Sequence, residues 1–449
     1  MHPLLSKYLV WTPTLLLRGE NIRPLMRAYA ESQYLDRGIL EKAQLESFKQ
    51  VVEYAYQQVP FYREKYQRAG FTPDQLRLPE DVRRVPLLTK EEVKRADLSS
   101  GSYRGMRFRR STSGSTGQPL VYYKDPESMR HMDAILYRDY SWYGVDVGFR
   151  QARFWGLPPA GASRYTTQAI DLLLNRVRIS PFELEEKKYL GFLETLQRFR
   201  PQYIYGYAQS IYQFCHYFHL RGIDLSGLGV GCVIVTSEMI FPSQLRVISE
   251  VLGCRTPQEY GCTEVGIIGF ECPMGSMHLM ENLLVETVPA EEGEGDNIVV
   301  SELNGRLFPF IRYQIGDRGA ISDRRCGCGR ELKVLEQLTG RKDDFIRCRE
   351  GKLVDAYLVE YLVSGMPGRL GTVHQFKMVQ TEMTSLRLMM VASGNRDGIR
   401  GYLCGKLAEI VGPGMVIDLE FVPSIAREKS GKLRFFSCEI PDPEGGGAP

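Results

Sequence analysis

Hydrophobic residues recur with helical spacing in the first part of the chain. Over residues 36–70, Phe48, Val51 and Val52 fall on one face of a helix because they are three or four positions apart. Pro60 lies inside this run, and proline is tolerated at the start of a helix but not in its interior. The pattern therefore predicts one helix that ends before Pro60 and a second that continues to Gly70.

Later segments follow other patterns. Residues 227–240 hold a continuous β-branched run, which is typical of a buried strand in a parallel or mixed sheet. Residues 296–322 alternate strand-like segments with turn signals such as Asn304-Gly305, so we expect a β-rich region there. From about Leu353 onward, short helices and strands alternate as in a small α+β unit.

These patterns predict an α/β fold with two parts. We expect a large N-terminal α/β domain with a β-rich subdomain over residues 1–340. We expect a small C-terminal α+β domain over residues 341–449, because the character of the sequence changes there.

The composition is that of an ordinary globular protein. Of the 449 residues, 43% are hydrophobic and 25% are charged. The formal net charge is only +3 and no block of Lys and Arg stands out, which argues against nucleic acid as a partner. The 10 cysteines are scattered rather than spaced as a disulfide framework. We therefore expect reduced thiols in a cytoplasmic protein, with a metal site left open.

The first stretch of sequence, MHPLLSKYLVWTPTLLLRG, is apolar but interrupted. Lys7 and prolines break the run, which is too short for a transmembrane span and lacks the cleavage site of a signal peptide. Two interpretations stay open. The segment packs against the first domain, or it contacts a membrane surface through Leu4, Leu5, Leu15 and Leu16.

Residues 109–123, RRSTSGSTGQPLVYY, crowd hydroxyls and glycines ahead of an apolar run. Such residues make a poor helix or strand interior, but their backbone N–H groups and hydroxyls suit an anion such as a polyphosphate. The stretch lacks the Lys of the G-x-x-x-x-G-K-[ST] pattern, so it is not an ordinary P-loop. Taken alone, it is equally consistent with a flexible solvated loop.

Further polar stretches follow this loop in a particular order. They are YGCTEVG at 260–266, RYQIGDRG at 312–319, LTGRKDD at 338–344 and REKSGKLRFF at 427–436. The ordered set resembles the adenylate-forming superfamily of acyl-CoA synthetases and adenylation domains. The short length, the Gln-Pro after the Ser/Gly loop and the CGCGR segment are most similar to its phenylacetate–CoA ligase branch, which includes relatives from capsule biosynthesis.

The resemblance implies an enzyme that activates a carboxylic acid with ATP, so that the carboxylate attacks the α-phosphorus and pyrophosphate leaves. Such an enzyme mainly holds the phosphates, neutralises developing charge and positions the nucleophile. The Ser/Gly loop is then implied to hold the β- and γ-phosphates through Ser113, Gly114, Ser115, Thr116 and Gly117.

The resemblance also implies roles for the later motifs. Thr263 contacts the α-phosphate and Glu264 holds Mg²⁺, a hard cation that prefers carboxylate oxygen. The alternative for this motif is a plain turn with a capping Thr. The rest of the nucleotide, that of ATP or AMP, is implied to lie on Tyr260 and Gly261 at the adenine and on Asp317 and Arg341 at the ribose.

The last motifs imply a moving C-terminal domain. Lys432, in SGKLRFF, is implied to bridge the carboxylate and the α-phosphate as the catalytic Lys, because an ammonium on a flexible stem can reach into a site. Asp343 lies where a hinge is expected, about which the small domain rotates after adenylation. The segment after the hinge, REGKLVDAYLVE, departs from the usual pattern of the family and weakens the case for CoA as acceptor.

Aromatic residues are frequent where the family binds its acid. The segments that match are at 203–214 and 235–240, and they suggest an aryl or other apolar acid, although aromatic runs at helical spacing also occur in ordinary cores. The residues expected to line the acid pocket are Tyr207, Ala208, Thr236, Ser237 and Glu238.

A separate set of residues has the chemistry of a metal site. Cys272, His278, Cys326 and Cys328 supply three thiols and one imidazole, and the Cys-x-Cys pair on a Gly-rich turn lets both thiolates face one ion. We expect a structural Zn²⁺ here. The alternative is ordinary buried cysteines with an unrelated histidine.

The overall prediction is an acid–thiol ligase that forms an acyl-adenylate and passes the acyl group to CoA. Two alternatives stay open: transfer to an amine or hydroxyl acceptor, and a nucleotide-binding homologue without turnover. The expected partners are a small carboxylic acid and an acyl acceptor, and a homodimer is also left open.

Overall fold

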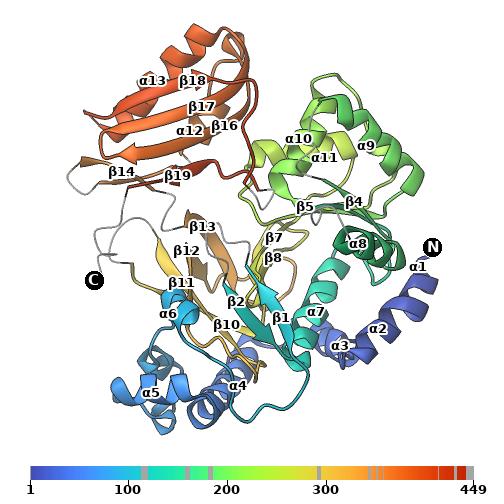
Figure 1. Cartoon of the computed structure of the whole chain (residues 1–449), viewed down its shortest axis with the longest axis vertical. Helices are drawn as coiled ribbons and strands as arrows, with labels where there is room; N and C mark the ends of the chain where they lie inside the picture. Colours follow the sequence, from blue (N-terminus) through green and yellow to red (C-terminus); the bar gives the residue numbers. More distant parts are fainter. Residues whose placement is uncertain are drawn as a thin grey trace.

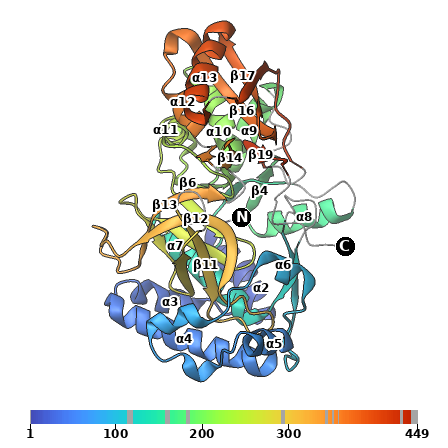
Figure 2. The same cartoon turned by 90° about the vertical axis from the view of Figure 1, so that its left-hand side faces the viewer.

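The structure is a computed structural model, and Figures 1 and 2 show it from two sides. It describes residues 2–112, 120–156, 162–180, 186–290, 295–341, 345–349, 352–356, 358–412, 414–428 and 432–440. In both views the sheet of the C-terminal part lies at one end of the molecule and helices α3 to α5 lie at the other.

The N-terminal region is helical. Its helices are α1 (Pro3–Leu5), the π-helical η1 (Ser6–Trp11), α2 (Thr12–Leu17), α3 (Arg23–Ser32), α4 (Arg37–Gln58), α5 (Pro60–Arg68) and α6 (Lys90–Arg95). The Asp36 side chain accepts a hydrogen bond from the Gly38 amide and so caps the start of α4. Pro60 is the first residue of α5. The predicted pair of helices separated at Pro60 is therefore confirmed.

The apolar N-terminal segment is only partly packed. Leu15 is buried, whereas Leu4, Leu5 and Leu16 are exposed. Among the described residues, no helix combines the length and the apolar run that crossing a membrane requires.

One large mixed sheet organises the main part of the molecule, in the order β10-β11-β12-β13-β9-β8-β7-β6-β5-β3-β4. The parallel half contains β3 (Gln151–Phe154), β4 (Arg176–Ile179), β5 (Tyr203–Tyr207), β6 (Cys232–Thr236) and β7 (Gln258–Cys262). The antiparallel half contains β8 (Gly266–Glu271), β9 (Met277–Leu279), β10 (Leu283–Val288), β11 (Asp296–Glu302), β12 (Tyr313–Ser322) and β13 (Val334–Arg341).

Helices cover both faces of the parallel half, as its buried strands require. They are α7 (Pro126–Ser141), α8 (Ala162–Leu173), α9 (Glu186–Phe199), α10 (Ala208–His219) and α11 (Pro242–Leu252). Alternate residues of a strand point to opposite faces, so Phe154 joins the core under α9, α10 and α11, while Tyr203 and Ile234 join the core under α7. The predicted strand within 227–240 is confirmed as β6, and all of its residues are buried.

The antiparallel half packs against α4 and α5 in a third core. Strands β11 and β12 pair with each other, which confirms the β-rich region expected over residues 296–322. A separate hairpin pairs β1 (Phe108–Ser111) with β2 (Val121–Lys124). Short 3-10 segments complete this part: η2 (Pro73–Gln75), η3 (Pro79–Arg84) and η5 (Ser226–Leu228).

The C-terminal part has its own sheet, ordered β18-β17-β16-β19, and its own core. Its elements are β14 (Phe345–Arg347), β15 (Leu353–Asp355), α12 (Leu358–Ser364), η8 (Gly368–Leu370), β16 (Gly371–Glu382), β17 (Ser385–Gly394), α13 (Arg396–Val411), β18 (Val416–Phe421) and β19 (Phe436–Cys438). The expected fold class is confirmed: a large α/β domain with a β-rich part, followed by a small α+β domain. The boundary after residue 340 stays a prediction.

Candidate active site

A cavity of about 2220 Å³ lies between the large sheet and the C-terminal part. Its wall includes the ends of the parallel strands, where Thr236 and Glu259 lie, and the C-terminal residues His374 and Lys432. The carboxyl ends of parallel strands are the usual ligand site of such sheets, because the loops that follow them diverge there.

The predicted phosphate-binding residues, Ser113, Gly114, Ser115, Thr116 and Gly117, lie outside the described residues. The stem on which they are carried is described. The Thr112 amide donates to the Leu120 carbonyl at 3.0 Å, and the Leu120 amide donates to Thr112 Oγ1 at 3.0 Å. Thr112 and Ser111 line the cavity. The β1–β2 hairpin therefore brings the base of this loop to the cavity.

Thr263 and Glu264 lie in the tight connection between β7 and β8 and line the same cavity. The Glu264 side chain accepts hydrogen bonds from Thr263 Oγ1 at 3.1 Å and from the Tyr313 hydroxyl at 3.2 Å. Burial and the nearby Glu264 carboxylate raise the pKa of Tyr313, so that its hydroxyl remains a donor. The result is a buried carboxylate held in place by two hydroxyls at the cavity wall.

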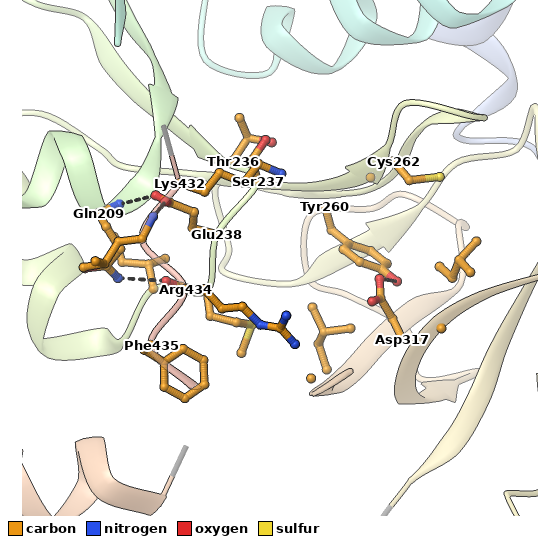
Figure 3. A pocket seen from close by; sticks show the side chains of 18 of the residues that line it. Gln209, Thr236, Ser237, Glu238, Tyr260, Cys262, Asp317, Lys432, Arg434 and Phe435 are labelled. Carbon is orange, nitrogen blue, oxygen red and sulfur yellow. Dashed lines mark hydrogen bonds between the residues drawn. The ribbon is translucent and has the colours of Figure 1, made fainter. Parts of the chain in front are cut away.

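Tyr260 and Asp317 come together from β7 and β12. The Tyr260 hydroxyl donates to Asp317 Oδ2 at 2.9 Å, and Figure 3 shows the two side chains facing each other. Gly261, next to Tyr260, approaches the backbone closely: a Cβ here would lie 2.3 Å from the Gly266 carbonyl oxygen. A larger residue at position 261 would push β7 and β8 apart.

The two residues expected near the hinge are only partly described. Arg341 is the last residue of β13, and its backbone pairs with that of Asp317 on β12. Asp343 lies outside the described residues.

Lys432 lies on the C-terminal segment that enters the cavity, on the side of Glu238 and Gln209 in Figure 3. Tyr260 and Asp317 lie on the other side of that view. The Leu433 amide, one residue after Lys432, donates to Glu238 Oε1 at 2.6 Å. Arg427 Nη2 also donates to Gln213 on α10, at 2.8 Å. These bonds hold the Lys432 segment against the large domain.

The five residues predicted to line the acid pocket divide into two groups. Thr236, Ser237 and Glu238 line the cavity. Tyr207 and Ala208 are not part of its described wall: Ala208 is fully buried and Trp155 stacks on Tyr207, with ring centroids 4.3 Å apart. Trp155 itself lines the cavity, and the role of Tyr207 and Ala208 in binding the acid stays a prediction.

Glu238 holds the Lys432 segment. Its carboxylate accepts from the Gln209 amide at 2.9 Å as well as from the Leu433 amide. Burial raises the pKa of Glu238, and Arg427, with a nitrogen 3.9 Å from the carboxylate, opposes that rise. The sequence could not assign this role, because the bonding partner lies almost 200 positions away along the chain.

Two polar residues of the wall were missed from the sequence. Glu259 precedes the YGCTEVG motif and accepts hydrogen bonds from the hydroxyls of Tyr140 at 2.7 Å and Tyr205 at 3.1 Å. Burial raises the pKa of Glu259. Arg153 also lines the cavity; it lies in β3, where an arginine between Ala152 and Phe154 was the available signal.

The four predicted metal ligands meet at one place, away from the cavity wall. The ligand atoms of Cys272, His278, Cys326 and Cys328 all lie within 4.8 Å of one another. Cys272 Sγ is 3.7 Å from Cys326 Sγ, and Cys328 Sγ is 3.2 Å from His278 Nε2.

The surroundings of His278 suit a metal ligand. Its Nδ1 lies 3.3 Å from the Leu332 carbonyl oxygen, which can only accept, so the proton lies on Nδ1 and the lone pair on Nε2 faces the thiols. Burial lowers the pKa of His278 to about 4 and keeps the ring neutral. Three thiols and one neutral imidazole are a donor set that fits tetrahedral Zn²⁺.

Comparison with known proteins shows what the chain is similar to. No family model matches the chain. The chain is 25% identical over 447 residues to the phenylacetate–coenzyme A ligase of Thermus thermophilus, an alignment that covers 90% of this chain and 97% of that protein. It is 21% identical to protein CapK of Staphylococcus aureus over 88% of each chain. These similarities support the expected resemblance to the phenylacetate–CoA ligase-like branch of the adenylate-forming superfamily.

Solved structures show the same fold as this chain. A crystal structure of 2-hydroxyisobutyryl-CoA ligase in the post-adenylation state, with R3-HIB-AMP, has a TM-score of 0.73 at 20% identity and covers 92% of this chain and 91% of that chain. The thioesterification state of that ligase, with 2-HIB-AMP and CoA, has a TM-score of 0.59. The arrangement of this chain is therefore more similar to the post-adenylation state.

Proposed function

We propose that this protein is an ATP-dependent acid–CoA ligase that forms an acyl-adenylate, releases pyrophosphate and transfers the acyl group to CoA. One observation carries the proposal: a single cavity is lined by Thr263 and Glu264, by Asp317 and by Lys432, which come from three distant parts of the chain. The relatives named phenylacetate–coenzyme A ligase support the same activity.

In the first half-reaction, an oxygen of the substrate carboxylate attacks the α-phosphorus and the bond to pyrophosphate breaks. Thr263 contacts the α-phosphate, and the Lys432 ammonium neutralises the charge that develops between the carboxylate and this phosphate. The Ser/Gly loop at 113–117 holds the leaving β- and γ-phosphates. Tyr260 and Gly261 lie along the adenine, while Asp317 and Arg341 contact the ribose hydroxyls.

Glu264 is the residue that would hold Mg²⁺. Its buried carboxylate, next to the Thr263 hydroxyl, offers the hard oxygen donors that this cation prefers. When bound, Mg²⁺ neutralises phosphate charge. The hydrogen bond from Tyr313 orients the carboxylate whether or not the cation is present.

The second half-reaction needs the C-terminal domain to move. The Lys432 segment docks on Glu238 and Gln213 through polar contacts that a rotation about Asp343 would release. CoA then attacks the acyl carbonyl and AMP leaves. The second candidate for the acyl acceptor is an amine or a hydroxyl. This alternative is supported by the REGKLVDAYLVE segment, which departs from the family pattern.

We also propose that Cys272, His278, Cys326 and Cys328 bind one structural Zn²⁺. All four positions of a tetrahedral shell would be filled by protein, which leaves no place for an activated water. The ion would join the β8–β9 hairpin to the connection between β12 and β13, at the opposite end of β8 from the β7–β8 turn that carries Glu264.

The deciding experiment measures acid-dependent exchange of pyrophosphate into ATP over a panel of carboxylic acids, followed by AMP release with and without CoA. We expect exchange with at least one acid, and AMP release that accelerates when CoA is added. Exchange with no stimulation by CoA would favour an amine or hydroxyl acceptor. A complete lack of exchange would favour a nucleotide-binding protein without turnover.

A further inference from the structure

Arg153 is a cation in the interior of the large sheet. It lies in the four-residue strand β3, with neighbours Ala152 and Phe154 buried in the core under α9 and α10. Because side chains alternate along a strand, Arg153 points to the opposite face, toward α7, where it lines the cavity together with Trp155 and Tyr205. The Arg153 guanidinium lies over both rings, 4.7 Å from the Trp155 centroid and 5.1 Å from the Tyr205 centroid.

Arg153 has no anionic partner among the described residues. Its Nε is buried without a hydrogen-bond partner, and no ion pair of its guanidinium occurs in that part of the chain. The neighbouring strand offers a direct contrast. Arg178, opposite Arg153 in the β3–β4 register, donates to Asp171 Oδ2 at 2.8 Å. Arginines withdrawn from water are ordinarily paired, because an unpaired buried charge is costly.

The nearest carboxylate does not supply the missing partner. Glu259 is close enough to interact electrostatically with Arg153, but no nitrogen of Arg153 comes within ion-pair distance of it. The Glu259 carboxylate instead accepts the hydroxyls of Tyr140 and Tyr205. The positive charge of Arg153 therefore faces the cavity, whereas the nearby Arg176 and Arg178 are both paired with Asp171.

The position of Arg153 sets which part of a substrate it can contact. Strand β3 is three strands away from β7, whose end carries Thr263 and Glu264. At about 4.8 Å per strand, that separation is roughly 14 Å. An acid whose carboxylate reacts beside Thr263 would extend its far end toward Arg153, between the aromatic rings that flank the guanidinium.

We propose that Arg153 binds a second anionic group on the substrate, so that the acid activated here is a dicarboxylic acid with a flat or hydrocarbon middle. This inference rests on the proposed ligase function and names its substrate class. The aromatic side chains contact the middle of the molecule. The guanidinium donates hydrogen bonds to the second carboxylate in the two-point geometry that arginine favours.

The test compares pairs of acids that differ only in the far group. The probes are 4-carboxyphenylacetate against 4-methylphenylacetate, and adipate against hexanoate, each measured by ATP–pyrophosphate exchange. We expect the wild-type protein to use the diacid of at least one pair with a kcat/KM about 10- to 100-fold higher than that of its monoacid, the range of a charged hydrogen bond. Arg153→Met should abolish this preference, and Arg153→Lys should keep part of it.

Arg178→Met is the matched control, because Arg178 lies opposite Arg153 but is paired with Asp171. It should keep the wild-type ratio of diacid to monoacid. A second measurement follows the melting temperature with 4-carboxyphenylacetate, which should stabilise the wild-type protein and the Arg178→Met variant but not Arg153→Met.

The outcomes separate this inference from the ligase function itself. If the wild-type protein uses the monoacids at least as well as the matched diacids, the inference is overturned and the ligase function stands. If no acid supports exchange but the diacid stabilises the protein through Arg153, the ligase function is overturned and the binding site stands. An unchanged preference in a folded Arg153→Met variant would also overturn the inference.

Discussion

The two ends of the cavity are built from different kinds of sequence. At the β7 end, Thr263 and Glu264 come from one short polar motif and meet Tyr260 within the same seven residues. At the β3 end, Arg153 comes from a four-residue strand, Gln151–Phe154, that belongs to none of the polar motifs, and Glu259, whose hydroxyl donors are Tyr140 and Tyr205, lies in β7 more than 100 positions later. The nucleotide is common to a whole superfamily of enzymes and its contacts form motifs, whereas the acid differs between enzymes and its contacts do not.

This comparison predicts that changes at the β7 end and on the Lys432 segment alter adenylation with every acid. Changes at the β3 end should alter the choice of acid. The predictions below test that division, and the first has the largest expected effect.

Lys432→Ala should lower the rate of adenylation by about 10²–10³-fold, the loss expected for one charge-stabilising donor. ATP binding and thioester formation from a pre-made adenylate should be retained, because the proposed role of Lys432 is confined to the first half-reaction. Pyrophosphate exchange measures the first effect, and single-turnover thioester formation measures the second. Lys406→Ala, on the exposed part of α13, is the control. If Lys432→Ala exchanges pyrophosphate into ATP at nearly the wild-type rate, Lys432 is not a catalytic residue.

Glu264→Gln should lower kcat about 10-fold or more and raise the Mg²⁺ concentration needed for half-maximal activity, because an amide is a weaker ligand for a hard cation. Glu259→Gln is the matched change on β7 itself, where the carboxylate accepts from Tyr140 and Tyr205 instead of from Thr263 and Tyr313. It should shift the KM for the acid and leave the Mg²⁺ titration as in the wild type. The same Mg²⁺ titration in Glu264→Gln and wild type would show that Glu264 only shapes the β7–β8 turn.

Cys326→Ser should reduce bound zinc and lower the melting temperature by roughly 5–10 °C, since a structural metal contributes directly to folding stability. The kinetic constants of the protein that remains folded should change little, because the four ligands lie away from the cavity wall. Elemental analysis and thermal unfolding check both points. Cys404→Ser, on α13, should keep the zinc. If wild-type protein prepared with zinc available contains none, the four residues are ordinary buried thiols and a structural histidine.

The smallest expected effect concerns pH and the contact between the two domains. His216 on α10 and His374 on β16 meet at 3.2 Å between Nε2 and Nδ1, and His374 Nε2 lies 3.0 Å from Ser393 Oγ. Burial lowers the pKa of His216 to about 4, and His374 and His219 lower it further. His216 therefore binds a proton less readily in the folded protein than in the unfolded chain.

The contribution of neutral His216 to the free energy of unfolding is therefore at its full value above pH 6.5, the ordinary pKa of histidine. This contribution is lost as the pH falls from 6.5 toward 4. Between pH 7.5 and 5.5 we expect a loss of about 1 kcal/mol. His216→Gln cannot be protonated, so its melting temperature should fall less over this range than that of the wild type. If the melting temperatures of the two proteins depend on pH in the same way, the protonation of His216 does not affect stability.

Local patterns were enough to predict the scaffold. The two helices separated at Pro60, the buried strand β6 and the strands of 296–322 all form where the sequence placed them. Proline and the spacing of apolar residues act within a few positions, so their effect is visible without the fold. That Cys272, His278, Cys326 and Cys328 lie together was predictable for a related reason, because three thiols and one imidazole are a common set of metal ligands; zinc itself stays a prediction.

What the sequence by itself determined is therefore the class of fold and the polar residues that gather in short motifs. Only the tertiary structure decided how those residues are used. It showed that Glu238, a residue of the cavity wall, also accepts a hydrogen bond from the Lys432 segment, and that Trp155 stacks on Tyr207. It also left Arg153 facing the cavity without an anion among the described residues. Each of these contacts depends on residues that strand order and domain docking bring together. Such long-range pairings produce no periodic pattern in the sequence.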